Sequence, residues 1–351
     1  MENQGSGVNN RSFLSVEDAL KRIIKDISIV STEEVSLISA LDRVTADDVK
    51  ARRSQPPVAV SSMDGYAVKS EDVTTVPSKL IRVASVPAGR EYTKKLKNGE
   101  AVRIFTGAPI PKGADTIVIQ EDVTAPSETD GSEITIVKGA KKGVYIRRSG
   151  LDFKNGEIGI PKNKRLTSRD IGLAASMNVP WILVRRRPRI AILATGDEIV
   201  RPGESASKNQ IVSSNSYMLH AFMTALGADV QILGIAPDDS DTIGALAREA
   251  YGSDLLVTTG GASVGEHDLI QKALSTDKFG KQGLNLNFWK IAMRPGKPLI
   301  FGELQQKPFI GLPGNPVSTM ICGLIFLKPV IETMLGLEHK QETVFASLSK
   351  D

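Results

Sequence analysis

The chain has 351 residues, more than one hydrophobic core usually organises, so we expect roughly two to four domains. Its net charge of +4 is too small for the basic surface of a nucleic-acid-binding protein. No apolar run reaches the length of about 18 residues that predicts a membrane span. The single cysteine excludes an internal disulfide, and the polar N-terminus lacks the apolar core of a secretion signal. These features predict a cytoplasmic protein without nucleic-acid or membrane partners.

The first half of the chain changes from helical to β-rich patterning. We expect a disordered leader over 1–12, a helix capped by Ser15, and a short helical stretch near Leu37–Leu41. From 58 to 144, short β-branched runs alternate with Gly, Pro and Asn turns, which predicts a small all-β domain. Thr167 then opens another helix as a hydroxyl cap. The β-branched runs are Leu80–Val86, Ala101–Thr106, Thr116–Gln120 and Glu133–Val137.

From Pro188 onward, apolar strands alternate with capped helices. This alternation predicts βαβ units, a parallel sheet and ligands bound beyond the carboxyl ends of its strands. Cys322 lies in an apolar run and is expected in the core. The expected strands are Ile190–Ala194, Val230–Ile235, Leu255–Thr259 and a strand-like run at Phe288–Met293. The expected helices begin at Ser213–Asn215, at Ser240 or Asp241, near His267 or Asp268, and at Pro316 after an Asn315 cap.

Carboxylates occur in each of three loops that follow predicted strands. Such groups repel one another at a shared sheet edge unless a cation bridges them, and oxygen ligands suit Mg²⁺. The alternative is that they are solvated loop residues or helix caps. The acidic residues are Asp197, Glu198, Asp238, Asp239, Glu266 and Asp268.

Backbone amides and cations are expected at the same edge. Gly260 to Ser263 precede a helix, where free amides and the helix dipole favour an anion, although a tight turn without a ligand is the simpler explanation. Lys290, Arg294 and Lys297 lie in and after the Phe288–Met293 run. Anion-binding groups and carboxylates together are what a phosphate and a metal ion require.

A serine hydrolase is a competing hypothesis, because residues 261–265 (Gly-Ala-Ser-Val-Gly) match the nucleophile-elbow pattern around Ser263. Asp277 and His339 are the plausible acid and base that follow it. No HGGG-type oxyanion segment precedes it, which disfavours this hypothesis.

Six motifs in register resemble the molybdopterin molybdenumtransferases, a family that includes the gephyrin E domain. The resemblance covers roughly residues 12 to 345. The motifs are Ser62–Val68, Phe105–Pro111 with Gly113–Asp115, Arg147–Asp152, Thr195–Glu198, Gly260–Gly265 and Leu312–Ser318.

The resemblance implies an elongated α/β chain with a β-rich insertion. Residues 13–57 and 145–187 would form a mixed α/β domain. In an alternative arrangement, the N-terminal helix packs on the molybdopterin-binding domain. Residues 58–144 would form the inserted domain, 188–341 a three-layer molybdopterin-binding domain, and 342–351 the start of an absent C-terminal domain. It also implies a homodimer that inserts molybdate into adenylylated molybdopterin with release of AMP, assisted by Mg²⁺ or another divalent cation. The molybdopterin adenylyltransferase that supplies the substrate is a possible partner.

The resemblance also assigns roles to individual residues. Asp64, Asp152, Glu198 and Asp268 match catalytic acids, and Glu198, Asp238 and Asp268 match metal ligands. The substrate-binding positions are Arg147, Thr195, Gly260, Gly261, Ser263, Lys290, Arg294, Lys297 and Asn315. Arg294 stands where many members carry Lys, which keeps the charge but changes its geometry. Without the C-terminal domain, a non-catalytic molybdopterin-binding or scaffold protein is the alternative function.

Overall fold

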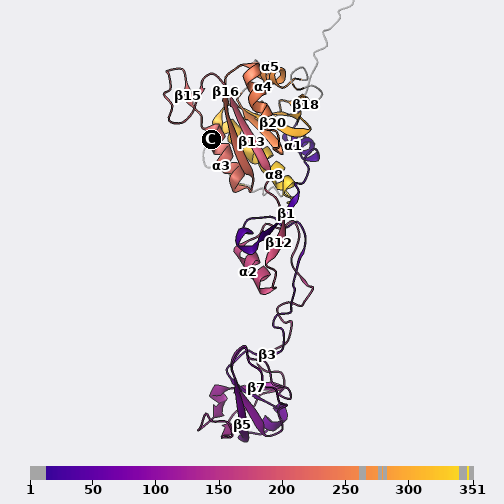
Figure 1. Ribbon diagram of the computed structural model, residues 1–351, viewed down its shortest axis with the longest axis vertical. Helices are drawn as coiled ribbons and strands as arrows, with labels where there is room; N and C mark the ends of the chain where they lie inside the picture. The colour runs from indigo at the N-terminus through magenta and orange to yellow at the C-terminus, as the bar shows by residue number, and fades with distance from the viewer. Residues whose placement is uncertain (1–12, 261–265, 276–278, 280–282, 340–345, 348–351) are drawn as a thin grey trace, which may run out of the picture.

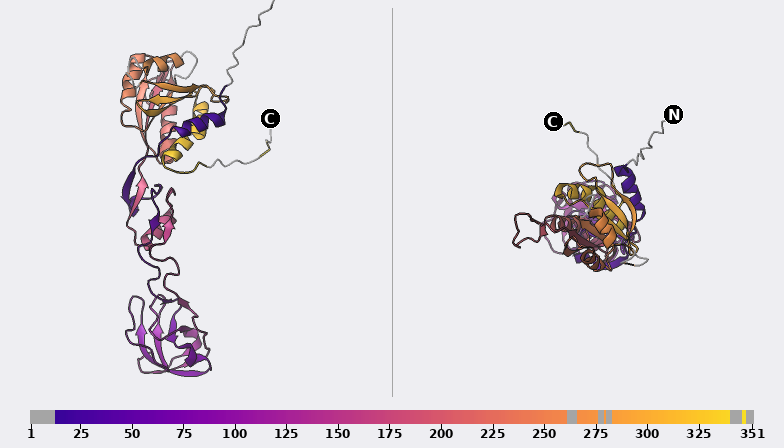
Figure 2. Two further views of the ribbon diagram at one scale, coloured as in Figure 1. Left: turned by 90° about the vertical axis from the view of Figure 1, so that its right-hand side faces the viewer. Right: turned by 90° about the horizontal axis from the view of Figure 1, so that it is seen from above.

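The computed structural model describes residues 13–260, 266–275, 279, 283–339 and 346–347. The molecule is elongated, with an α/β body at one end, a small body in the middle and a β-rich body at the other end (Figures 1 and 2).

The β-rich body is built on a six-stranded sheet in the order β7-β4-β6-β5-β9-β8. The predicted β-branched runs are all strands, and their inward side chains, such as Leu80, Ile104 and Ile134, are buried. The bounds are β4 Gly65–Val68, β5 Ser78–Val86, β6 Glu100–Ile104, β7 Thr116–Ile119, β8 Val123–Thr124 and β9 Glu133–Ile136, with 3₁₀ turns at Ser70–Val73 and Gln120–Asp122.

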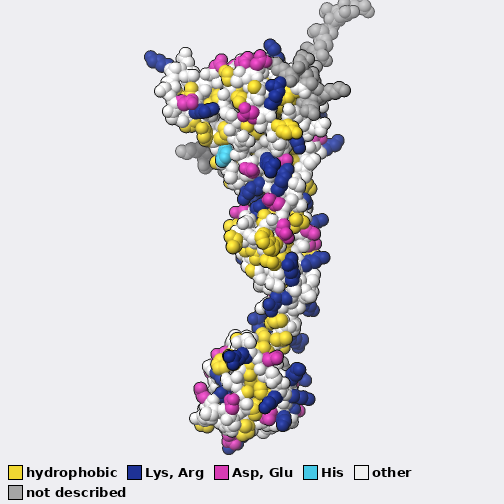
Figure 3. Space-filling view, viewed as in Figure 1, with side chains coloured by type: hydrophobic (Ala, Val, Ile, Leu, Met, Phe, Trp, Pro, Cys, Tyr) yellow, Lys and Arg dark blue, Asp and Glu magenta, His cyan; other side chains and the backbone are white. Residues whose placement is uncertain are grey.

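Three short antiparallel ladders join the two chain segments that flank the β-rich body. In these ladders β1 (Thr32–Ser36) pairs with β12 (Trp181–Arg185), β2 (Val49–Lys50) with β11 (Ile158–Ile160), and β3 (Val60–Ser61) with β10 (Ile146–Arg147). Helix α2 (Ser168–Ser176) begins at the predicted Thr167 cap, and the expected helical stretch near 37–41 is a 3₁₀ turn at Leu37–Ser39. Hydrophobic surface gathers over this middle body (Figure 3).

The α/β body holds a six-stranded sheet in the order β16-β13-β17-β20-β19-β18. Its first four strands are parallel and β18 runs in the same direction, but β19 is antiparallel to both of its neighbours, β20 and β18, so the expectation of a parallel sheet is wrong for β19. The cause is a two-residue hairpin turn between β19 and β20, where Gln305 and Gln306 both have positive φ. The bounds are β13 Arg189–Thr195, β16 Asp229–Ala236, β17 Leu255–Thr259, β18 Asn285–Trp289, β19 Ile300–Leu304 and β20 Lys307–Leu312, beside a small β14 (Ile199–Val200) and β15 (Ile211–Val212) pair.

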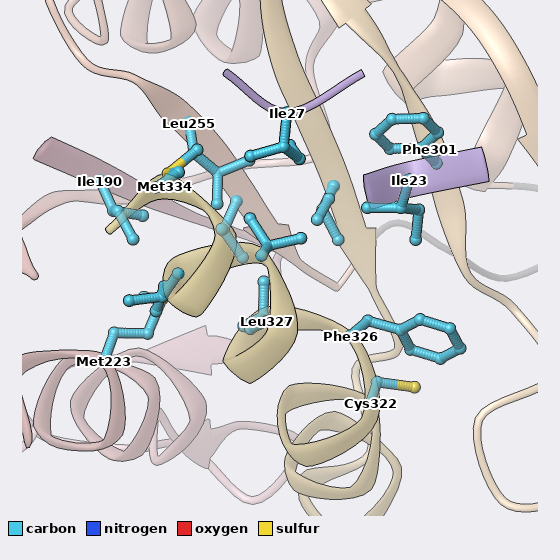
Figure 4. Close-up of a cluster of buried hydrophobic side chains, with 14 of the residues drawn as sticks. Ile23, Ile27, Ile190, Met223, Leu255, Phe301, Cys322, Phe326, Leu327 and Met334 are labelled. Carbon is cyan, nitrogen blue, oxygen red and sulfur yellow. The ribbon is translucent and has the colours of Figure 1, made fainter. Parts of the chain in front are cut away.

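Helices cover both faces of this sheet, so the predicted three-layer architecture is confirmed. One face packs against α1, α3 and the long helix 316–334, and the other against α4 and α5. Figure 4 shows Ile23, Phe301, Phe326 and Leu327 meeting in the first of these cores. The cap of α4 is Asp239, one residue before the expected Ser240. The bounds are α1 Val16–Lys25, α3 Asn215–Ala225, α4 Ser240–Arg248, α5 Glu266–Ala273, α7 Pro316–Cys322 and α8 Lys328–Met334.

The helix Pro316–Met334 is long and apolar enough to cross a membrane by length and composition, but 56% of it is buried inside the protein. Core packing therefore accounts for its apolar side chains. A π-helical turn at Gly323–Leu327 separates α7 from α8, just before Pro329, which has no N–H to donate to the preceding turn. Cys322 is buried as expected, and burial raises the pKa of its thiol to about 12.

A part-buried ion pair joins the entry of β13 to the entry of β17. The Arg186 guanidinium donates to both carboxylate oxygens of Asp254, at 2.6 and 2.7 Å, and the Arg189 N–H donates to the same carboxylate. Burial opposes ionisation of Asp254, but these hydrogen bonds outweigh it and hold the pKa of the carboxyl below its ordinary value.

We predict that Asp254→Asn lowers the free energy of unfolding of the α/β body by about 2 kcal/mol, because Arg186 loses its charged partner. The exposed pair Lys21–Glu17 supplies the control, and Glu17→Gln should cost much less, because solvent screens the pair. Since the folded pKa is depressed, the Asp254 contribution is present at neutral pH and is lost as pH falls below about 4. Denaturant curves at pH 7 and pH 3 measure this, and an equal loss for Asp254→Asn at both pH values would contradict it.

Candidate anion-binding site

The carboxyl ends of the parallel strands open on one edge of the sheet. Thr259 at the end of β17 pairs with Ala194 of β13 on one side and with Leu312 of β20 on the other. Ile300 pairs with both Gly311 and Trp289, so the 290–299 loop between β18 and β19 reaches the same edge. The expectation that these loops converge is therefore confirmed.

A pocket of about 340 Å³ lies between these loops. Thr195, Glu198, Gly260 and Asn315, four of the predicted site residues, line it. The first residues of α3 and of the helix 316–334 line it as well, so two helix N-termini point at one cavity. Because helix N-termini carry partial positive charge, this arrangement favours an anion. The full lining is Ala194, Thr195, Glu198, Ile199, Ile211, Val212, Ser213, Ser214, Asn215, Thr259, Gly260, Gly314, Asn315 and Pro316.

The strand ends of β13 and β17 approach each other closely at Gly260. This residue has φ of +89°, and a Cβ on it would lie 2.2 Å from the Thr195 carbonyl oxygen. Only glycine fits both the backbone conformation and the space. The Thr195 hydroxyl is buried and has no hydrogen-bond partner among the residues described, so it is available to a ligand or a water.

The turn before α7 is held by its own side chains. The Asn315 Oδ1 accepts from the Ser318 N–H at 3.1 Å, which confirms the predicted cap, and Pro316 occupies the first turn. The Thr319 hydroxyl donates to the Pro313 carbonyl at 2.6 Å. These bonds tie the turn to the start of the helix at the pocket wall.

The acidic loops meet as expected, but their residues have different roles. Glu198 is exposed and lines the pocket, whereas Asp197 accepts the Asp238 N–H at 3.0 Å and so joins the loops after β13 and β16. Asp239 is a helix cap that accepts from Thr242 N and Oγ1, so the simpler explanation holds for it. Asp268 belongs to the first turn of α5, but its side chain lies outside the described part.

Two of the three predicted cations lie against aromatic rings. The Lys290 Nζ is 3.6 Å from the Trp289 ring centroid, and the Lys297 Nζ is 4.5 Å from that of Phe13. Arg294 is exposed on the same loop. The loop therefore presents positive charge at the sheet edge that carries the pocket.

Asp64, Arg147 and Asp152 lie elsewhere. Asp64 precedes β4 of the β-rich body, and the Arg147–Asp152 pair lies at the junction with the middle body (Figure 1). Arg147 Nη2 donates to both Asp152 oxygens, at 2.8 and 2.9 Å. Asp64 Oδ1 accepts from Thr106 N and Oγ1, both at 2.8 Å, and these bonds lower the pKa of the carboxyl. Thus the predicted site residues divide into two groups, one at the sheet edge of the α/β body and one in the β-rich body and its junction with the middle body.

The hydrolase hypothesis fails on the placement of its base. Ser263, like Gly261 and Asp277, lies outside the described residues, but it follows Gly260 at the pocket edge by three positions. His339 follows the helix 316–334, which starts at that edge and spans about 28 Å. Its Nδ1 contacts Glu332 near the far end of this helix. His339 therefore cannot serve a nucleophile beside Gly260.

Asn215 was missed as a site residue. The sequence pattern marked Ser213–Asn215 as a helix start, which is correct, but the Ser214 cap makes no side-chain capping bond. The Asn215 side chain instead reaches Thr259 and Gly314. No local pattern signals contacts over 44 and 99 residues.

The fold and the pocket define an elongated α/β protein with a cavity at a sheet edge whose lining favours an anion. Two family models match it: "MoeA N-terminal region (domain I and II)" over residues 14–178 and "Probable molybdopterin binding domain" over residues 191–333.

Similar proteins agree with these matches. Molybdopterin molybdenumtransferases from Nostoc sp. and Haemophilus influenzae are each 34% identical, over 90% and 92% of this chain and 72% and 78% of their own lengths. The crystal structure of a molybdopterin biosynthesis MoeA protein from Pyrococcus horikoshii matches with a TM-score of 0.80 at 32% identity, over 93% of this chain and 81% of that one. The chain belongs to the molybdopterin molybdenumtransferase family, a family of molybdenum-cofactor biosynthesis enzymes.

We predict that Gly260→Ala costs about 1–3 kcal/mol more stability than Gly252→Ala, because it adds overlap with the Thr195 carbonyl to the same backbone strain. Gly252 is the matched control, since its φ is +93° and nothing lies within 4 Å of the Cβ position. Urea unfolding of both variants measures the difference, and equal losses would show that the strand ends separate freely.

Proposed function

We propose that this chain inserts molybdate into adenylylated molybdopterin and releases AMP. The observation that carries the proposal is the pocket at the sheet edge, where two helix N-termini, the Gly260 turn and the Glu198 carboxylate meet. Cleaving a phosphoanhydride requires stabilised negative charge, which amides and cations held in place supply. The relatives named as transferases favour catalysis over the scaffold alternative.

In this proposal one set of residues binds the phosphate and another set, on a neighbouring loop, attracts the molybdate. Thr195, Gly260 and Asn315, together with Gly261 and Ser263, hold a phosphate through hydroxyl and amide donors. Lys290, Arg294 and Lys297 attract the molybdate oxyanion to the neighbouring loop, because their charges lie on the same sheet edge.

The acidic residues fit a divalent cation in part. No group of three acidic, histidine or cysteine side chains that could hold a metal occurs within the described ranges. Mg²⁺, however, is commonly bound by one or two carboxylates, with waters and substrate phosphates completing its shell. Glu198 and Asp238, on neighbouring loops, with Asp268 would hold such an ion, which would neutralise the phosphoanhydride charge.

We predict that EDTA abolishes AMP release from adenylylated molybdopterin and that Mg²⁺ restores it. Glu198→Gln and Asp268→Asn should each lower kcat by at least about 100-fold with little change in melting temperature, because each removes a metal-binding charge. Glu204→Gln is the control, since Glu204 binds the Arg201 N–H on an adjoining loop. An undiminished rate in EDTA would refute the metal, and a melting temperature lowered by many degrees would show that these acids are structural.

We further propose a homodimer in which Asp64, Arg147 and Asp152 complete the pocket of the partner subunit. In one chain they lie far along the molecule from the pocket edge (Figures 1 and 2). The middle body exposes large hydrophobic side chains, including Ile38, Trp181 and Leu183, which a second copy would cover. The structural alternative for Asp64 is a turn residue before Gly65, where Asp-Gly supplies a tight β-turn and Thr106 donates to the carboxylate.

We predict that Asp64→Asn and Glu198→Gln proteins, each inactive alone, recover roughly a quarter of wild-type activity after mixing and reassociation. Random exchange makes about half of the dimers mixed, and each mixed dimer has one intact site. Mass spectrometry confirms the exchange. If mixed dimers form without activity, Asp64 does not act across the interface.

We also propose a location, a partner and a domain division for the chain. It works in the cytoplasm and receives its substrate from the molybdopterin adenylyltransferase. Its domains are 13–57 with 145–187, then 58–144, and 188–341. The ladders between β1 and β12, β2 and β11, and β3 and β10 support this division, because they close the middle body on both sides of the insertion.

A further inference from the structure

The Asn215 side chain connects three elements at the pocket. It projects from the first residue of α3, and its Nδ2 donates to the Thr259 hydroxyl at 2.9 Å and to the Gly314 carbonyl at 2.7 Å. Thr259 ends β17 immediately before Gly260, and Gly314 immediately precedes the Asn315 cap. One amide group therefore links the two glycine turns to the start of a helix.

The chemistry of its partners fixes the orientation of this amide. A carbonyl oxygen can only accept, so the group that faces Gly314 must be the NH₂ and not the oxygen. The Asn215 Oδ1 is buried and finds no partner in the described part of the chain. The Asn215 side chain does not serve as the helix cap, because the N-cap position of α3 is the preceding Ser214.

The β17–β20 ladder ends at the pair Thr259 and Leu312, and beyond this pair the side chains of Asn215 and Thr259 join the two turns. A Cβ on Gly314 would lie 3.6 Å from the Gly260 Cα, so the turns are in near contact without side chains between them. The Thr259 hydroxyl adds a long bond of 3.4 Å to the Pro313 carbonyl. A shift between these turns would change the pocket wall on which the bound anion rests.

We propose that Asn215 is a positioning residue for the substrate: it holds the turns at Gly260 and Gly314 at the spacing that fits the bound phosphate. The inference rests on the proposed function, because it names a residue that shapes the same pocket. Asn215 acts through the Thr259 hydroxyl and the Gly314 carbonyl and need not touch the reacting atoms. Its loss therefore weakens binding more than it slows the chemical step.

The test compares Asn215→Ala and Asn215→Asp with Thr224→Ala. Asp keeps the volume of Asn but turns a second oxygen toward the Gly314 carbonyl, so it should not rescue the loss. For both Asn215 variants we expect the KM for adenylylated molybdopterin to rise at least about tenfold, with kcat lowered less than about threefold. Thr224→Ala should keep wild-type KM and kcat, because Thr224 is an exposed residue of the same helix outside the pocket lining.

These kinetics separate positioning from general stability. A purely structural role reduces the fraction of folded enzyme, which lowers apparent kcat and leaves KM unchanged. That outcome, or a wild-type KM in Asn215→Asp, overturns the proposal. Thr259→Val removes one acceptor of the Asn215 amide, and its effect on KM should be less than additive with that of Asn215→Ala. Full additivity would show that Asn215 does not act through Thr259.

Hydrogen exchange tests the same residue without any substrate. In Asn215→Ala, peptides covering 255–260 and 312–316 should exchange faster than in wild type, while peptides of α4 stay unchanged. Unchanged exchange in the two turns overturns the proposal. If wild-type enzyme releases no AMP, the proposed function fails, and the exchange result still decides whether Asn215 holds the turns.

Discussion

The close approach of two strand ends, Thr195 of β13 and Gly260 after β17, determines the shape of the pocket. Parallel neighbours lie about 4.8 Å apart, and the chain must turn away from the sheet within that spacing. A side chain at Gly260 would occupy the place of the Thr195 carbonyl, so the turn depends on glycine. With the turn in this position, the N-termini of α3 and α7 border the same space, and their partial positive charge favours an anion there.

The second constraint is the length of the molecule. Three two-stranded ladders carry the chain from the α/β body through the middle body, and only β1 with β12 exceeds three residues in each strand. Short ladders bury little surface and leave the β-rich body far from the pocket of the same chain (Figure 2). A reaction that uses residues from both bodies therefore requires two chains. The proposed chemistry thus depends on the proposed dimer.

Local sequence signals predicted most of the helices and strands, whereas features that depend on contacts between distant residues could not be predicted. Hydrophobic runs and caps located β17 and the Asn315 cap, because such patterns reflect interactions within a few residues. The hairpin at Gln305 and Gln306 lacked the Asn-Gly or Asp-Gly signal that marks such turns. Asn215 was read as part of a helix start, because its partners Thr259 and Gly314 are distant in sequence. Whether Glu198 and Asp268 share a metal also depends on spatial placement.

The charges of the pocket explain why a cation belongs in the proposal. Glu198 lines a cavity whose helix N-termini attract anions, yet its own carboxylate repels them. Two like charges about 4 Å apart near a protein surface repel each other by about 4 kcal/mol, and this repulsion would cancel much of the attraction from the amides. A divalent ion between carboxylate and phosphate reverses the sign of this interaction. Cation and substrate then strengthen each other's binding, and by linkage the coupling is the same in both directions.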